Sequence, residues 1–198
     1  MSFTPTPPGP SAANRNFPSE HGQAFQILAR YKNEGGVQVN LDILPHVTEE
    51  AYLDANPAAR PARAFMIMCS EGDVSGIVEL LQTTQEDYEE GEPVMPPAQL
   101  LRYQDPLDGM KSALHLAIEK GQLEVAWLLL WLASDLPDEQ FPAEVIHAAS
   151  GMNAQRASGT DEIDIRSLRD EQGQNAEDLA KTVGGPWNSL VQSEILFK

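Results

Sequence analysis

Apolar residues at helical spacing dominate residues 112–132, SALHLAIEKGQLEVAWLLLWL. Before Gly121, apolar positions such as Leu114 and Ala117 share one face of a short helix. After Gly121, the positions i, i+3, i+4 and i+7 from Val125 are apolar, and so are those between them. A helix that is apolar on all sides must be covered on more than one side. The run is too short to cross a bilayer, so we expect a buried helical hairpin that requires neighbouring elements.

The same patterns predict elements before this hairpin. Apolar residues at helical spacing predict an amphipathic helix over 21–32, which ends before the glycine pair at 35–36. Residues 37–41 alternate between apolar and polar, which is typical of a short extended segment. Thr48 and the acids after it indicate a new helix start. Residues 64–81 repeat the pattern of two short helices around a glycine.

The central hairpin resembles the ankyrin repeat, whose signature is T-P-L-H-x-A, through the sequence SALHLA at residues 112–117. Ser112 stands where the family has Thr, and its hydroxyl can cap the helix and meet the His115 ring. Ala117 is small enough for paired helices to approach closely, and Gly121 permits the tight turn between them. The resemblance implies an all-α solenoid of helix-turn-helix units with short hairpin fingers, used for protein–protein recognition.

Two further segments fit this pattern, so we expect repeats near 64–82, 108–133 and 165–195. The first repeat lacks a sequence like Ser-Ala-Leu-His at the start of its first helix. The third keeps the D-x-x-G-x-T-P register from Asp170, with Asn175 for Thr, and an extended finger arm is expected before it.

The spacing between repeats is uneven. From Gly72 to Gly121 is 49 residues (121 − 72), against a family period of about 33. The excess predicts an acidic insertion at 83–107, and Asp108-Gly109 falls one residue early for the turn before the central repeat. From Gly121 to Gly184 is 63 residues (184 − 121), which leaves room for a degenerate unit at 140–160.

These segments divide the chain into three parts. Residues 1–20, rich in Pro, Ser and Asn, are expected to form a disordered tail. Residues 21–63 are expected to form a helical extension that caps the first repeat. Residues 64–198 would be the ankyrin-repeat domain.

Composition limits the classes of molecule that the protein is expected to bind and the compartment in which it is expected to lie. A net charge of −17 argues against binding nucleic acid through its phosphates. It favours a basic protein partner, although the same acidity also serves solubility. The single cysteine excludes an internal disulfide framework. The absence of a signal peptide or membrane span predicts an intracellular protein, cytoplasmic or nuclear or both, and we expect it to be monomeric alone.

Candidate chemistry is sparse. The four histidines are scattered, with no partner at metal-ligand spacing, and His147 lies among apolar residues, as a core histidine does. Cys69 is expected to be a buried hydrophobe. Trp127 and Trp131 are expected to contact a neighbouring helix or the insertion. No phosphate-binding or nucleophile motif is present. We therefore expect no enzyme activity, no cofactor and no metal.

Partner-binding positions follow from the resemblance and from the acidic insertion. The family's variable contact positions fall on Ser70, Glu71, Lys111, Glu119, Lys120, Glu171, Gln172, Gln174, Thr182 and Val183. The insertion adds acids clustered around Tyr88, namely Glu86, Asp87, Glu89, Glu90 and Glu92. Two interpretations of the insertion stay open. It is either a solvated acidic loop or a contact loop that grips a basic, partly apolar segment of a partner.

Two functions remain at this point. One is an adaptor or escort that binds a basic protein segment through its concave face and the acidic insertion. The other is a regulatory subunit built stably into a larger complex, such as a protease or chromatin assembly.

Overall fold

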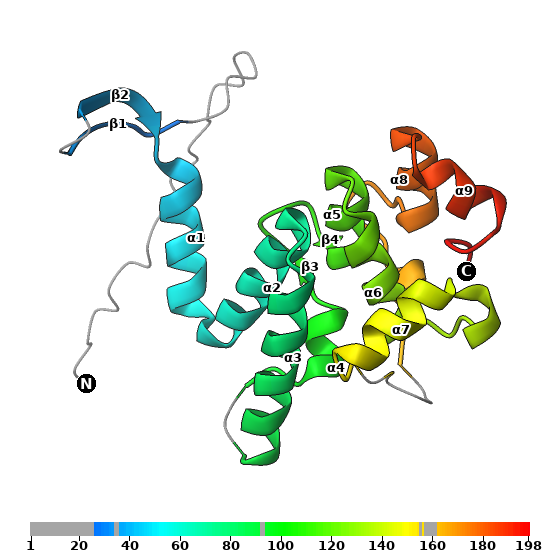
Figure 1. Cartoon of the computed structure of the whole chain (residues 1–198). Coiled ribbons are helices and arrows are strands. Elements are labelled where there is room, and N and C mark those ends of the chain that lie inside the picture. The colour runs from blue at the N-terminus through cyan, green and yellow to red at the C-terminus, as the bar shows by residue number, and fades with distance from the viewer. Residues whose placement is uncertain (1–25, 34–35, 92–93, 155, 157–161) are drawn as a thin grey trace, which may run out of the picture. The chain divides into compact units, whose positions relative to one another are not determined.

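The computed structural model describes residues 26–33, 36–91, 94–154, 156 and 162–198, and this part of the chain is mostly helical (Figure 1). The described residues divide into two compact units, with the boundary between His46 and Val47. None of the helices in the described ranges is long and apolar enough to cross a membrane. The elements are β1 (Leu28–Asn33), β2 (Gly36–Asp42), α1 (Leu44–Ala55), η1 (Pro57–Ala59), α2 (Arg60–Glu71), α3 (Val74–Glu89), α4 (Pro97–Leu101), β3 (Gln104–Asp105), β4 (Lys111–Ser112), α5 (Ala113–Lys120), α6 (Leu123–Ala133), η2 (Asp138–Gln140), α7 (Ala143–Gly151), η3 (Ile165–Ser167), α8 (Ala176–Val183) and α9 (Trp187–Gln192).

The first unit contains a β-hairpin where we expected a helix. The expected extended segment at 37–41 is confirmed as part of β2. Residues 28–33 form β1, which pairs with β2 antiparallel, and residues 26–27 are not helical, so the helix predicted over 21–32 is wrong for its described residues. Residues 21–25 lie outside the described residues. Short apolar runs fit helix and strand alike, and here pairing with a neighbouring strand decides.

The hairpin also breaks the alternation of its second strand. The register shifts between Ala29 and Tyr31, and Asn40 adopts a left-handed conformation with φ 60°. Ala29 pairs with Leu41, whereas Lys32 pairs with Val37. Because directly paired residues share a face, the irregularity places Leu41 on the face opposite Val37.

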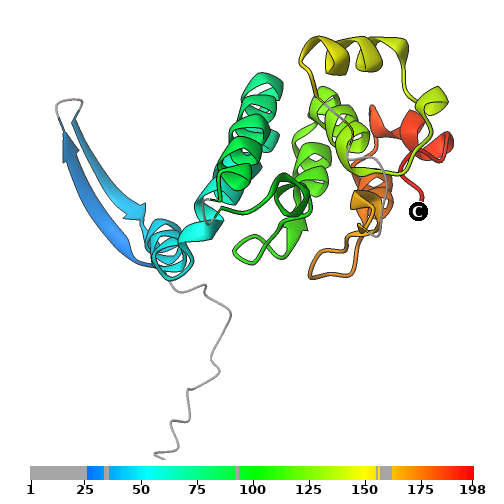
Figure 2. The same ribbon diagram turned by 90° about the horizontal axis from the view of Figure 1, so that it is seen from below.

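Within the described residues of the second unit, α2 packs against α3, α5 against α6 and α8 against α9. Figure 2 shows the same helices from below. The first helices of the pairs, α2, α5 and α8, lie side by side, with α5 in the middle. We call α2, α5 and α8 the inner row. Ala113, Leu114, Ala117 and Ile118 of α5 are fully buried. The predicted central hairpin is therefore confirmed as the core of this unit.

The turn of the first pair stacks on the turn of the second. Gly72 ends α2 with φ 85°, and Asp73 starts α3 by accepting a hydrogen bond from the Gly76 amide at 2.9 Å. Gln122 Nε2 donates to the carbonyl of Ser70 at 3.0 Å. A Cβ on Gly72 would stand 2.6 Å from Gln122 Oε1 and would displace the end of that side chain. The left-handed φ of Gly72 favours glycine at this position in any case.

His115 joins the central pair to the loop before α8. Its Nδ1 accepts from the Ser112 hydroxyl at 2.8 Å and from the Ser112 amide at 3.3 Å. Its Nε2 donates to the carbonyl of Gln174 at 3.0 Å. The contact predicted between the hydroxyl and the ring is confirmed. Burial lowers the pKa of His115, and a neutral ring is also what an accepting Nδ1 requires.

Helix α6 has neighbours on several sides, as its all-round apolar sequence predicts. It contacts α5, α3, α4, α7 and η3. Trp127 and Trp131 both pack edge-on against Phe141, at centroid distances of 6.0 Å and 5.2 Å. Trp131 Nε1 donates to the carbonyl of Ala154. The predicted role of the two tryptophans as packing residues is confirmed, and their partner is the segment after α6 rather than the acidic insertion.

The segment between α6 and α8 does not add a unit to the inner row. The sequence left room for a degenerate unit at 140–160, whose inner helix would be residues 143–150. A helix is present there, α7, but it packs against α6, and α8 packs directly against α5. His147 is exposed, so the prediction of a core histidine is wrong, because α7 buries only its other side.

The described part of the insertion at 83–107 contains helical segments and is not simply a loop. Helix α3 continues into the insertion as far as Glu89 and includes Glu86 and Asp87. Helix α4 follows, and its Leu100 and Leu101 are buried. The arm expected before the third repeat also differs, since η3 replaces an extended strand. The turn after it keeps its predicted register, because the Gly173 amide donates to the carbonyl of Asp170 at 2.9 Å.

Candidate partner-binding surfaces

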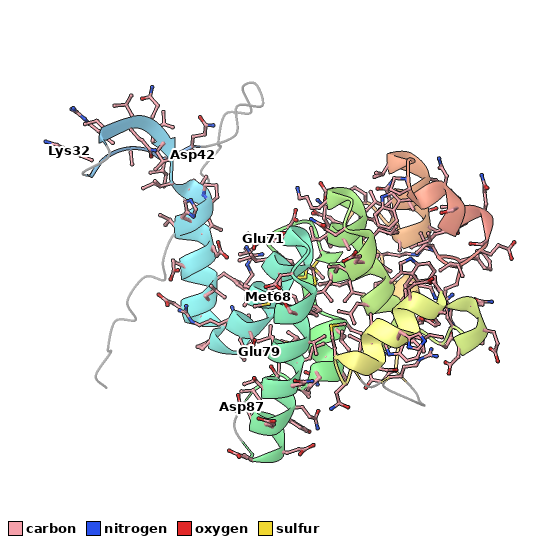
Figure 3. All side chains as sticks on the ribbon, in the orientation of Figure 1. Lys32, Asp42, Met68, Glu71, Glu79 and Asp87 are labelled. Atoms are coloured by element: carbon pink, nitrogen blue, oxygen red, sulfur yellow. The ribbon has the colours of Figure 1, made fainter. Side chains whose placement is uncertain are left out.

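Most contact positions predicted on the inner row lie at the carboxyl ends of its helices. We call these ends the inner-row surface; Figure 3 labels Glu71 on it. Ser70 is half-buried, and its carbonyl is occupied by Gln122. The exposed members are Glu71 on α2, Glu119 and Lys120 on α5, and Thr182 and Val183 on α8. Because α2, α5 and α8 are neighbours, the structure brings these residues to one edge of the row.

Lys111 is engaged within the protein. Its Nζ lies 2.8 Å from Glu119 Oε2 and 3.3 Å from Asp108 Oδ1. The hydrogen bond raises the pKa of Lys111 and lowers that of Glu119. A partner at this position would meet a neutralised pair rather than a free cation.

Strands β3 and β4 pair antiparallel and form a short hairpin before α5. The loop before α8 lies against this hairpin. The Glu171 amide donates to the carbonyl of Gly109 at 2.8 Å, and Gln104 Nε2 donates to the carbonyl of Arg169 at 2.6 Å. The side chains of Glu171 and Gln172 are exposed, and Gln174 is half-buried. The predicted contact positions in this loop thus stand beside those of the central pair.

The acids of the insertion fall into two groups, those at the end of α3 and Asp105. Glu86, Glu89 and Glu90 are exposed, and Asp87, labelled in Figure 3, is half-buried. None of these four forms a salt bridge with a described residue. Glu92 lies outside the described residues. Asp105, which the sequence groups with the acids of the insertion, behaves differently.

Asp105 is a structural residue. It is 1% exposed, pairs with Arg63, and accepts from the Leu107 amide at 2.9 Å. Arg63 also forms a salt bridge with Glu49, with 2.8 Å between Arg63 Nη2 and Glu49 Oε1. A buried carboxylate with these partners ties α1 and α2 to the hairpin before α5, and it is not available to another protein.

The acidic end of α3 borders a groove of about 520 Å³. One wall is α3, the other is α4, and Ala154 and Arg156 close one side. Apolar side chains line its depth, namely Val78, Leu81, Leu101 and Leu132. Gln82 and Gln85 join Glu86 and Glu89 along the α3 wall. We call this hollow the outer groove, because it is built from helices outside the inner row.

The sequence prediction missed the two glutamines and the groove itself. The available signal was the spacing of Gln82, Gln85, Glu86 and Glu89, which is i, i+3, i+4, i+7 and places all four on one helix face. That signal required α3 to continue through the insertion. A smaller hollow of about 290 Å³, lined by Trp127 and Val145 among others, lies between α6 and α7.

A second buried ion cluster secures the carboxyl-terminal end. Arg166 Nη2 lies 2.7 Å from Asp164 Oδ2, and its Nη1 donates to the carbonyl of Phe197 at 2.8 Å. Burial opposes ionisation of Asp164, but the hydrogen bonds from Arg166 and from the Asp135 amide hold the pKa of Asp164 well below its usual range. No spacing rule pointed to this cluster, whose role is structural.

The remaining reactive groups form no site within the described ranges. Cys69 is fully buried, as predicted, and burial raises the pKa of its thiol. No group of His, Cys, Asp and Glu among the residues with described positions could hold a metal ion.

No family model matches this chain, and neither a curated protein nor a solved structure matches it.

Proposed function

We propose that residues 64–198 form an ankyrin-type solenoid of three helix pairs, and that the protein is a non-enzymatic adaptor or escort for a basic segment of another protein. The side-by-side inner row supports the solenoid. The hydrogen bond between Ser112 and His115 also supports the solenoid, because both residues belong to the segment that resembles the repeat signature. A stack of helix pairs offers extended surfaces for protein recognition.

The observation that carries the basic-partner proposal is the acidic end of α3. Four carboxylates, from Glu86 to Glu90, stand there without a salt bridge to any described residue, beside a groove with an apolar lining. Elsewhere, buried carboxylates such as Asp105 and Asp164 are paired with arginines. Unpaired charge beside apolar surface favours a partner that carries both positive charge and apolar side chains.

A variant with Gln at Glu86, Glu89, Glu90 and Glu92 and Asn at Asp87 tests this proposal. It should fold normally, because these side chains carry little of the packing. Its capture of partner proteins, identified by mass spectrometry at about 0.1 M salt, should fall, mainly through slower association. The wild type should lose the same partners at about 1 M salt, where the screening length falls from about 10 Å to about 3 Å. Undiminished capture by the variant at low salt would contradict the proposal.

The exposed face of the β-hairpin supports a second function, a regulatory subunit built into a larger assembly. Leu28, Val37 and Val39 are 56%, 46% and 60% exposed. A two-stranded hairpin is marginally stable alone in water, so these side chains fit a permanent apolar interface. In that case association should resist high salt, and Ser at Val37 and Val39 should release the protein from the assembly.

A further inference from the structure

The shape of the outer groove narrows the choice of occupant. Its walls are the helices α3 and α4, whose backbone groups are bonded within each helix, so the groove offers no strand edge. An extended peptide lying there would leave its own backbone groups without protein partners. A helix satisfies its backbone internally and presents only side chains. The groove therefore favours a helical occupant over a strand.

The α3 wall sets the charge pattern that the occupant must match. Glu86 and Glu89 are three residues apart on one helix face, which brings their side chains within about 5–6 Å of each other at the Cβ atoms. Glu89 accepts a hydrogen bond from Gln85 Nε2 at 2.5 Å, which leaves its charge uncompensated. Basic side chains one helical turn apart on a partner would face both carboxylates.

The side of the groove that Arg156 closes does not neutralise these acids. Arg156 lies over the rings of Trp131 and Phe141, at 5.0 Å and 5.2 Å from their centroids. Its guanidinium also pairs with Asp138 and donates to the carbonyl of Ser134 at 3.1 Å. With its donors used there, Arg156 closes the groove as a fixed wall.

We propose that the outer groove binds an amphipathic helix of a protein partner. Its apolar face would lie over Leu81, Leu101 and Leu132, and two Lys or Arg residues one turn apart would pair with Glu86 and Glu89. This proposal rests on the proposed function and deepens it, because it assigns the basic segment a conformation and a single site. A volume of about 520 Å³ lies within the range of about 300–1,000 Å³ typical of ligand pockets, so it accommodates side chains from one face of a helix.

The chain offers a matched pair of variants to test the groove. Glu86→Gln with Glu89→Gln removes two charges that line the groove, and Asp87→Asn with Glu90→Gln removes two charges that do not. Both double variants change the net charge equally and lie on the same helix end. A difference between them therefore reports the position of the charges and not their number.

The probe is a synthetic helical peptide of about 18 residues, long enough for a helix to persist, with a Leu face bordered by Lys residues one turn apart. Its binding to the full chain is measured by fluorescence anisotropy at about 0.1 M salt. The groove variant should bind about tenfold or more weakly, and the matched control should change affinity by less than about threefold. Equal weakening by both variants would reveal diffuse attraction and would overturn the groove assignment.

Amide chemical shifts separate failure of the groove from failure of the proposed function. Shifts induced by the peptide should cluster on α3, α4 and the residues around Ala154. Shifts that cluster instead at Glu71, Lys120 and Val183 would place a basic segment on the inner-row surface. That outcome would overturn the groove while leaving the adaptor intact. Ala98→Phe provides an independent check, because it fills the groove from α4 and should abolish peptide binding in a folded protein.

Discussion

Acidic side chains of this protein lie in two contrasting environments, one buried and paired and the other exposed. At the hairpin before α5 and at the carboxyl-terminal end, Asp105 and Asp164 are buried, and each is paired with an arginine. At the end of α3, Glu86 and Glu89 stand in solvent with no salt bridge to a described residue. A buried charge is tolerated only when it is paired and hydrogen-bonded. An exposed charge needs no partner within the chain and so remains available to another molecule. The position of a carboxylate in the fold, not the number of carboxylates, decides whether it is paired within the protein or left exposed.

The largest expected effect comes from a buried carboxylate that has no partner. Ala117 is fully buried in α5, at the centre of the inner row. Ala117→Asp should unfold the second unit, because an unpaired charge there costs several kcal/mol, comparable with a total stability of about 5–15 kcal/mol. Circular dichroism and urea titration would measure this. A cooperative, folded variant would contradict the placement of the core.

Removing the cation from a buried pair should cost less. Arg166→Met leaves Asp164 buried without its main partner, and we expect a loss of about 3–5 kcal/mol in the free energy of unfolding. The matched control is Arg166→Met combined with Asp164→Leu, which removes both charges and should recover much of the loss. A single variant within about 1 kcal/mol of the wild type would show that the pair does not secure the carboxyl-terminal end.

A smaller effect is expected from pH. Because burial lowers the pKa of His115 in the folded state, the unfolded chain binds its proton more readily. The contribution of His115 to stability is fully present above its unfolded pKa of about 6.5 and is lost as pH falls from that value through the lower pKa of the folded state. The slope should not exceed about 1.4 kcal/mol per pH unit. His115→Gln should flatten the dependence of the unfolding free energy on pH between pH 7 and pH 5 relative to the wild type, which urea titration at each pH would measure.

The smallest effect on stability should come from the acidic end of α3. Glu86→Gln with Glu89→Gln should alter the free energy of unfolding by no more than about 0.5 kcal/mol, as is usual at exposed sites. Thermal melts at low and high salt would measure it. A loss comparable with that of Arg166→Met would mean that these glutamates belong with the buried carboxylates, and the comparison between the two regions would fail.

Local patterns predicted the central part of the fold well. Ser112, His115 and Gly121 act within a few residues of each other, through a cap, a ring contact and a left-handed turn. Asp170 and Asn175 are equally local, since each side chain accepts from a backbone amide three or four residues away. Such contacts are set by backbone geometry over short distances, so a single sequence is enough to predict them.

The candidate site was predicted only in part. The acids of the insertion were recognised from their clustering, but their helical arrangement and the two glutamines beside them were not. The burial of Asp105 and its pairing with Arg63 were also not predicted, because Arg63 lies 42 residues away in the chain. Whether an acid is exposed or paired depends on which distant residues the fold brings near it, and composition carries no such information.

By itself, the sequence determined the helical hairpin of α5 and α6, the caps and turns around it, and the acidity at the end of α3. The tertiary structure alone decided that residues 28–33 form a strand, because β1 exists through its pairing with β2. It also decided that α7 packs on α6 rather than joining the inner row, and that α3 meets α4 to form the outer groove. The physical reason is common to all three. Helical spacing and caps act within one or two turns, whereas strand pairing, helix packing and the partners of buried charges are set between residues that are distant in sequence.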